Sequence, residues 1–184
     1  MKIITILLAL LYLPSYSSYS QEIKYKKTEV DSEIILELPE TFYLMPFEDV
    51  KQRVASYRKP TALYSDQDRL VEFGVNKSFS KWYSDDLELL QSFVKASLLN
   101  LYSDVEMLNE EIVDVNGRRF IIFEFDSKVS GTPDSNLAPI KKYTLLYYTL
   151  FKGQTVLFNF SSHFFEKEYW QPIAHNIMSS IKIK

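Results

Sequence analysis

Apolar and polar residues alternate along several segments of the chain, and this alternation predicts a β-sheet. Val71, Phe73 and Val75 stand at every second position, as they do in a strand with one buried face. Both parities are apolar between residues 141 and 152, so that strand should be covered on its two faces. Strands are predicted over residues 33–38, 62–65, 70–76, 141–152 and 155–162, with two more between 106 and 126 around the hairpin turn Asn116-Gly117.

A different spacing, with apolar residues three or four positions apart, predicts the helices. One helix covers about residues 85–101, another begins near residue 165, and a short one follows Pro46. Residues 23–30 are charged and weakly patterned, and residues 127–139 are typical of an exposed loop. The apolar stripe of the last helix is expected to be Phe165, Tyr169, Ile173, Ile177 and Ile181.

The fold class follows from the central strands. Strands that are apolar on both faces need a covering layer on each side, and the predicted helices are the only elements that can supply it. We therefore predict an α+β fold, an α/β/α sandwich with a central antiparallel sheet.

The first twenty residues have the order of a secretory signal peptide. Lys2 is followed by an apolar run over residues 3–13, and the small residue Ser20 precedes the expected cleavage point. The run has 11 residues, whereas a helix that spans a bilayer needs about 20, so no stable membrane anchor is expected after cleavage. We predict a signal peptide over 1–20, one domain over 21–184, and export to the periplasm or the cell exterior. The alternative is a buried amino-terminal strand or helix.

Composition and charge argue against several classes of function. The chain has 21 Lys and Arg against 24 Asp and Glu, so its net charge of −3 gives no reason to expect nucleic-acid binding. It has no cysteine, which fits a bacterial envelope better than a eukaryotic secreted module. The serines form no Gly-x-Ser-x-Gly motif, and four scattered glycines cannot build a phosphate-binding loop. We expect no enzymatic activity and no cofactor.

The two histidines are the candidates for metal or acid–base chemistry. His163 stands three residues before Glu166 and five before Glu168, a spacing that a hard metal or an acid–base pair could use. In the competing interpretation the glutamates complement a helix dipole and His163 ends a strand. We favour the second interpretation and predict no metal site, because the chain has no HExxH, paired-His or Asp-rich calcium motif. His175 is expected at the surface or boundary of the last helix.

Three segments resemble the PsbP-like fold superfamily: Leu38-Pro39-Glu-Thr-Phe42, the hairpin around Asn116-Gly117, and the ending Trp170…Ile177-Met-Ser-Ser180-Ile181. This superfamily includes the extrinsic photosystem II protein PsbP, a Ran-binding nuclear import factor and bacterial proteins related to type VI secretion chaperones. The resemblance implies a non-enzymatic domain that binds or steadies another protein, and the signal peptide and the lack of cysteine add that this member is exported and bacterial. It assigns no functional residue, because no position here matches a partner-binding or metal-binding position of a member.

Aromatic residues offer one candidate interaction surface. Trp82, Tyr83, Tyr143 and Tyr147 could line a groove for a peptide or a ligand, since Tyr and Trp are enriched at interfaces. The alternative is that they pack in the core. Three functions therefore stay open: a protein-binding or assembly accessory domain with a partner in the cell envelope, a small-ligand or lipid carrier, and a metal-assisted enzyme that uses His163 and Glu166.

Overall fold

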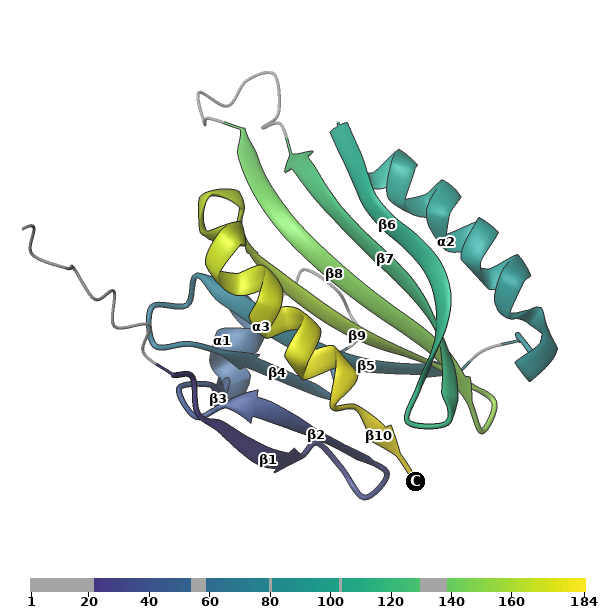
Figure 1. The fold of residues 1–184 in the computed structure, drawn as a ribbon, viewed down its shortest axis with the longest axis horizontal. Coiled ribbons are helices and arrows are strands. Elements are labelled where there is room, and N and C mark those ends of the chain that lie inside the picture. The colour runs from purple at the N-terminus through teal and green to yellow at the C-terminus, as the bar shows by residue number, and fades with distance from the viewer. Residues whose placement is uncertain (1–21, 54–58, 80, 103, 130–138) are drawn as a thin grey trace, which may run out of the picture.

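A seven-stranded antiparallel sheet forms the middle of the fold (Figure 1). The structure is a computed structural model that describes residues 22–53, 59–79, 81–102, 104–129 and 139–184. The strands lie side by side in the order β3 (Tyr43–Leu44), β4 (Ala62–Ser65), β5 (Val71–Phe79), β9 (Gln154–His163), β8 (Ile140–Phe151), β7 (Arg118–Val129) and β6 (Asp104–Val115). Because β5 pairs with β9, the chain leaves the sheet after β5 and re-enters it at the far edge as β6.

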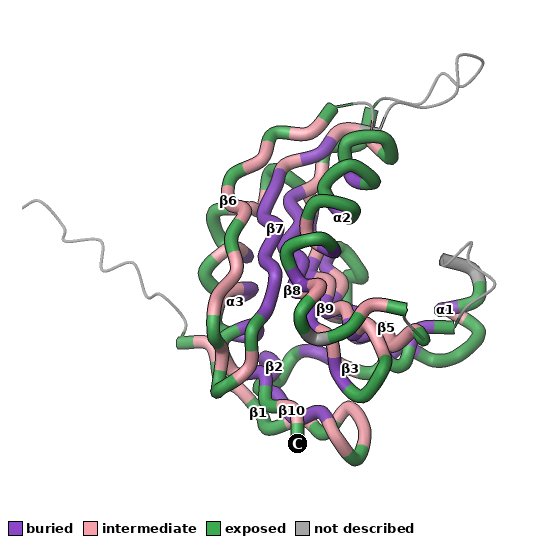
Figure 2. Tube along the Cα trace, turned by 90° about the vertical axis from the view of Figure 1, so that its right-hand side faces the viewer, coloured by how far each residue is buried: buried purple, intermediate pink, exposed green. Residues whose placement is uncertain are grey.

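Helices cover both faces of this sheet. α2 (Leu87–Leu101) follows the 3₁₀ turn η1 (Ser84–Asp86), and α3 (Lys167–Ser179) follows the 3₁₀ turn η2 (Phe164–Glu166). Figure 2 shows β7 and β8 between the two helices, with α2 on one side and α3 on the other. This arrangement confirms the predicted α/β/α sandwich. The third helix, α1 (Phe47–Arg53), lies near β4, where Val50 packs against Leu63.

Strand β8 is buried from both sides, as its sequence predicts. Tyr143, Leu145 and Tyr147 pack in the cluster beneath α3, whereas Leu146 packs in the cluster beneath α2. The α2 side consists of the buried helix residues Leu87, Leu90, Val94 and Leu98 against Ile121, Phe123, Phe125 and Leu146. Each large side chain that is fully buried in this way contributes roughly 1.5–3 kcal/mol to stability.

A second, three-stranded sheet lies beside the first and is absent from the sequence prediction. It has the order β1 (Tyr25–Glu29), β2 (Ile34–Pro39) and β10 (Lys182–Ile183), all antiparallel. The prediction missed β1 because its side chains are mostly polar and exposed. Its pairing with β2, which buries Ile34, Leu36 and Leu38 in the core, determines its conformation.

Most predicted elements agree with the structure, and the last helix needs a correction. Asn116 and Gly117 have φ angles of 52° and 81°, which confirms the hairpin turn. In the last helix, Phe165 and Tyr169 are exposed, and Trp170 is buried in their place. The reason is that Phe165 belongs to the tighter turn η2, so the α-helical period begins two residues later.

Some predictions fall partly outside the described residues. The predicted loop over 127–139 begins as strand, since β7 continues to Val129, and its middle lies outside the described ranges. The carboxyl end of the helix predicted after Pro46 also lies outside them. Within the described ranges, none of the helices combines the length and the apolar character that crossing a bilayer requires.

Candidate functional site

One flank of α2 exposes apolar side chains and carries no charge. The helix has two charged residues, Glu88 and Lys95, which are seven positions apart and so lie on the same side. Both are bonded to the sheet: Glu88 Oε1 accepts a hydrogen bond from Arg119 Nη2 at 2.6 Å, and Lys95 Nζ lies 2.6 Å from Glu110 Oε2. The other flank therefore has no charged group to attract water.

Large apolar side chains project from that flank. Leu89 and Phe93 are each 59% exposed, and Leu101 is 71% exposed. Folding gains nothing from leaving such side chains in water, and contiguous exposed apolar patches on soluble proteins mark interaction sites.

A groove of about 570 Å³ runs beside this flank. Its α2 wall includes Phe93 and Leu101, and its other wall includes Phe79 at the end of β5 and Trp82 shortly before η1. The rings of Trp82 and Phe93 lie 5.9 Å apart, and Phe79 is 91% exposed. Tyr148 and Thr155 of the sheet complete the lining, which includes one charged residue, Lys81. We call these residues the α2 groove.

The turn η1 holds the Trp82 wall in place. The backbone N–H of Tyr83 donates to the Asp86 carboxylate at 2.8 Å, and the N–H of Asp86 donates to the Tyr83 carbonyl at 2.9 Å. These two bonds close the turn directly before α2. Trp82, which is half-buried, therefore lies against the first turns of the helix.

Solved structures with the same arrangement identify the fold. The cyanobacterial PsbP protein CyanoP from Synechocystis sp. PCC 6803 aligns with a TM-score of 0.59 and 12% identity, over 90% of this chain and 96% of that one. The chain has a PsbP-like fold. The resemblance noted in the sequence is thereby confirmed for the fold. No protein-family model matches the sequence, and no curated protein matches it.

Two further proteins show the same PsbP-like fold. The Ran-binding protein Mog1p of Saccharomyces cerevisiae aligns with a TM-score of 0.55 and 12% identity, over 88% of this chain and 96% of that one. LpqN, which is involved in cell envelope biogenesis of Mycobacterium tuberculosis, aligns with a TM-score of 0.51 and 14% identity, over 88% of this chain and 91% of that one.

The structure separates the four aromatic residues that the sequence suggested as one surface. Trp82 lines the α2 groove, and Tyr83 beside it is exposed. Tyr143 and Tyr147 are buried on the opposite face of the sheet, beneath α3. The four residues therefore do not form a common surface, because Tyr143 and Tyr147 share the face of β8 that α3 covers, whereas Trp82 lies against α2 on the other face of the sheet. Core packing is the correct interpretation for Tyr143 and Tyr147.

His163 and Glu166 lie close in sequence but are not joined by a hydrogen bond. His163 ends β9, and its ring stacks on Phe165 at 5.3 Å. Glu166 belongs to η2, and its buried Oε2 atom has no hydrogen-bond partner. In the part of the chain that the structure describes, no three His, Cys, Asp or Glu side chains are grouped so that they could hold a metal ion.

A buried carboxylate beneath α3 escaped the sequence prediction. Glu124 of β7 is only 6% exposed and accepts hydrogen bonds at Oε1 from Tyr143 Oη (2.8 Å) and Gln171 Nε2 (2.7 Å). His175 Nε2 lies 3.2 Å from the same oxygen. Burial alone would raise the pKa of Glu124, but the hydrogen bonds from His175, Gln171 and Tyr143 outweigh it and lower the pKa to about 2.

The partners of Glu124 respond to its negative charge. Burial, reinforced by the bond to Glu124, raises the pKa of Tyr143, which therefore stays a neutral hydroxyl donor. The bond to Glu124 also raises the pKa of His175, and burial opposes this effect. Among the described residues, a second ion pair lies one turn away, where Lys167 Nζ is 2.6 Å from Asp126 Oδ2. The network binds α3 to the sheet through bonds of Gln171 and His175 to Glu124 Oε1.

One signal in the sequence could have revealed this network. Lys167, Gln171 and His175 recur at four-residue intervals, and so form a polar stripe along one side of α3. Glu124 and Asp126 alternate on one face of β7. Opposed polar stripes on a helix and a strand indicate bonds between the two elements, but the sequence does not show that the two elements meet.

Proposed function

We propose that this chain is an exported, non-enzymatic accessory domain that binds a protein of the cell envelope through the α2 groove. The observation that supports this proposal is the uncharged flank of α2, where Leu89, Phe93 and Leu101 are exposed beside Trp82. Such a surface combines exposed apolar side chains with an aromatic anchor, as the centres of protein interfaces do.

The shape of the groove favours a helical segment of the partner. The α2 flank is 15 residues long, which corresponds to about 22 Å of helix. A helix with one apolar face can lie along such a flank and cover Phe93, Leu101 and Phe79 together. Because the flank offers no charged residue, the contact face of the partner should also be uncharged, with its polar side facing water.

The structural neighbours support a binding role only by analogy. Mog1p is a Ran-binding protein and LpqN is involved in cell envelope biogenesis, and both have the PsbP-like fold. A shared fold does not transfer a binding site, because function depends on particular side chains. Export is part of the proposal too: residues 1–20 would be removed as a signal peptide, and residues 21–184 would form the exported domain.

Site-specific photocrosslinking tests the proposal. A benzophenone side chain is placed at Phe93 and, as the matched control, at Phe165, which is also an exposed aromatic residue but lies in η2 beyond the groove. We expect one envelope protein to be crosslinked from position 93 and not from position 165. The identified protein should then bind the purified wild type, and its affinity should fall about tenfold or more for Phe93→Asp, since one buried aromatic anchor commonly contributes over 1.4 kcal/mol.

Two results would contradict a protein partner. One is equal crosslinking from positions 93 and 165, because the groove would then have no special role. The other is a lipid that co-purifies in stoichiometric amount and is lost in Phe93→Asp, as seen by native mass spectrometry. That second result would favour the carrier hypothesis, with which the groove volume of about 570 Å³ is compatible.

A further inference from the structure

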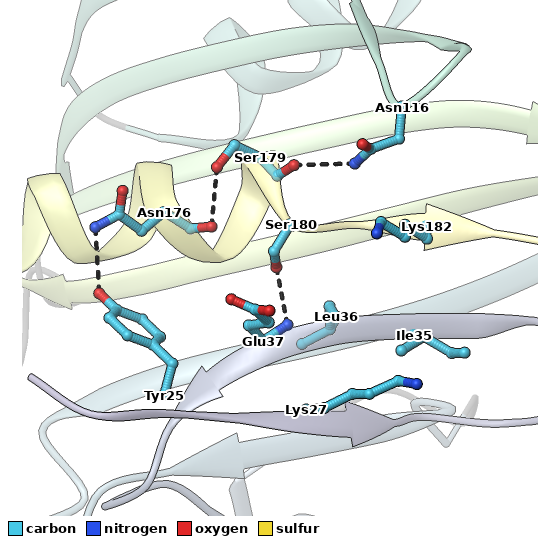
Figure 3. A pocket seen from close by; sticks show the side chains of 10 residues that line it. All are labelled: Tyr25, Lys27, Ile35, Leu36, Glu37, Asn116, Asn176, Ser179, Ser180 and Lys182. Carbon is cyan, nitrogen blue, oxygen red and sulfur yellow. Dashed lines mark hydrogen bonds between the residues drawn. The ribbon is translucent and has the colours of Figure 1, made fainter.

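A second hollow, whose lining is mostly polar, is built from other residues than the α2 groove. It has a volume of about 620 Å³ and forms where the carboxyl end of α3 and the β6–β7 turn approach β1 and β2 (Figure 3). The size is that of pockets for small molecules. The small sheet contributes the face that carries Tyr25, Lys27 and Glu37, opposite to the core residues of β2.

Hydrogen bonds between distant segments fix the walls of this hollow. Asn116, at the β6–β7 turn, donates through Nδ2 to the carbonyl oxygens of Ser179 (3.0 Å) and Ile181 (2.8 Å). The Ser180 hydroxyl accepts the backbone N–H of Glu37 at 2.8 Å and donates to the Ile177 carbonyl at 2.6 Å. These groups hold the wall and are not free to rearrange, so the hollow is formed before any ligand arrives.

Two ammonium groups in the hollow remain without a partner. The side chains of Lys27 and Lys182 form no ion pair or hydrogen bond with any residue that the structure describes. The neighbouring Lys26 behaves differently, because its Nζ donates to the carbonyl oxygens of Phe42 (2.7 Å) and Glu40 (3.2 Å). Figure 3 shows Lys27 and Lys182 toward the same end of the hollow.

The carbonyl groups at the carboxyl end of α3 accept hydrogen bonds from backbone groups and not from Lys27 or Lys182. The carbonyl oxygens of Asn176 and Ile177 accept the backbone N–H of Ser180, and the Met178 carbonyl accepts the N–H of Ile181. The last carbonyl groups of the helix are thus bonded within the chain. The Lys27 and Lys182 ammonium groups are therefore available to a ligand.

We infer that this hollow binds a small hydroxylated molecule that carries a carboxylate or a phosphate. Lys27 and Lys182 would face the anionic group, and they outnumber the single carboxylate of the lining, Glu37. Tyr25 Oη accepts a hydrogen bond from Asn176 Nδ2 at 3.3 Å, so its own hydrogen can be donated to the ligand. The Oδ1 atom of Asn116 and the Glu37 carboxylate supply acceptors for ligand hydroxyls. Acidic sugars and sugar phosphates have this combination of groups.

The site is independent of the α2 groove, since the two hollows share no lining residue. The charged side chains of the hollow are two lysines and one glutamate, so its local charge is positive, whereas the net charge of the chain is −3. A positive hollow on an acidic protein attracts anions locally, and this attraction should weaken as salt screens it over about 8 Å at physiological ionic strength.

Titration of the ¹⁵N-labelled chain, followed by NMR, tests this inference. The ligands are glucuronate, glucose 6-phosphate and, as the neutral control, glucose, all at constant ionic strength. We expect saturable shifts of amide signals from residues 25–27 and 176–182 with at least one of the two anions and none with glucose. In the variant Lys27→Gln/Lys182→Gln the affinity should fall about tenfold or more.

A matched variant separates the site from a general effect of charge. Lys24→Gln/Lys51→Gln removes the same charge from exposed lysines outside the hollow and should bind as the wild type does. The inference is wrong if neither anion gives saturable shifts, if glucose binds as well as the anions, or if the two double variants lose affinity equally. Thermal unfolding of both variants checks that they fold, which we expect because none of the four ammonium groups has a bonding partner among the described residues.

Discussion

The buried carboxylate of Glu124 allows a quantitative prediction about stability. Replacement by Gln keeps the shape of the side chain and removes its negative charge. In the wild type, Tyr143 and Gln171 donate to Glu124 Oε1, and His175 lies at 3.2 Å. In Glu124→Gln these donors face a neutral amide that has a single acceptor oxygen. The variant therefore loses charge-assisted bonds at a position that water can hardly reach.

The size of the loss follows from the pKa of Glu124. The change from 4.5 to about 2 corresponds to about 3 kcal/mol in favour of the ionised form in the folded state. This stabilisation is fully present above the unfolded-state pKa of 4.5 and is lost as the pH falls through that value toward 2. We therefore expect the free energy of unfolding of Glu124→Gln to be about 3 kcal/mol lower than that of the wild type at about pH 6. This difference should shrink by about 2 kcal/mol at about pH 3.

Urea unfolding of the wild type and the variant measures the difference in free energy of unfolding at each pH. Trp170 is buried on α3 and reports by its fluorescence whether the helix leaves the sheet. Glu88→Gln is the matched control, because Glu88 also bonds a basic residue at 2.6 Å but from an exposed position. Its cost should be clearly smaller than that of Glu124→Gln, because exposed ion pairs contribute little to stability.

The prediction for Glu124 is wrong if Glu124→Gln lowers the free energy of unfolding no more than Glu88→Gln does at about pH 6. It also fails if the cost of Glu124→Gln is the same at about pH 3, because a loss caused by packing alone would not depend on the ionisation of Glu124.

Three further predictions concern other parts of the molecule. Glu124 raises the pKa of His175, so the stabilising effect of the protonated His175 is fully present below pH 6.5 and is lost as the pH rises through the raised pKa. His175→Ala should remove this part of the pH dependence of the free energy of unfolding, and an unchanged pH profile would count against the pair. Gly117→Ala meets no atom within 4 Å but must adopt a φ of 81°, so urea unfolding should show a loss of about 1 kcal/mol from backbone strain alone, with groove binding unaffected. If residues 1–20 are a signal peptide, the intact mass of the exported protein should correspond to a chain that begins at Gln21, and a mass that includes Met1 would refute cleavage.

The sheet and its two covering helices could be predicted because their signals are local. The alternation of Phe123 and Phe125 and the double-sided pattern of β8 specify strands, and the apolar stripe of α2 specifies a helix. The turn at Asn116-Gly117 was predictable for the same reason, since few other dipeptides adopt two positive φ angles.

The binding groove and the buried network were predictable only in part. Trp82 was identified from its residue type, but its neighbour Phe93 belongs to another element, and only the packing of α2 brings the two rings to 5.9 Å. Glu124 stands in a strand where a carboxylate usually faces water, so its sequence context suggests exposure.

The sequence by itself thus determined most strands of the large sheet, the two helices that cover it and the turn at Asn116-Gly117, because backbone geometry and side-chain periodicity act between residues close together in the chain. Only the tertiary structure decided which face of each strand meets α3, that β1, β2 and β10 form a separate sheet, and that Tyr143 is in the core while Trp82 is half-buried in a groove. These outcomes depend on contacts between residues far apart in the chain, such as Glu124 with His175 and Asn116 with Ile181, and a local pattern carries no information on which distant partner a side chain will find.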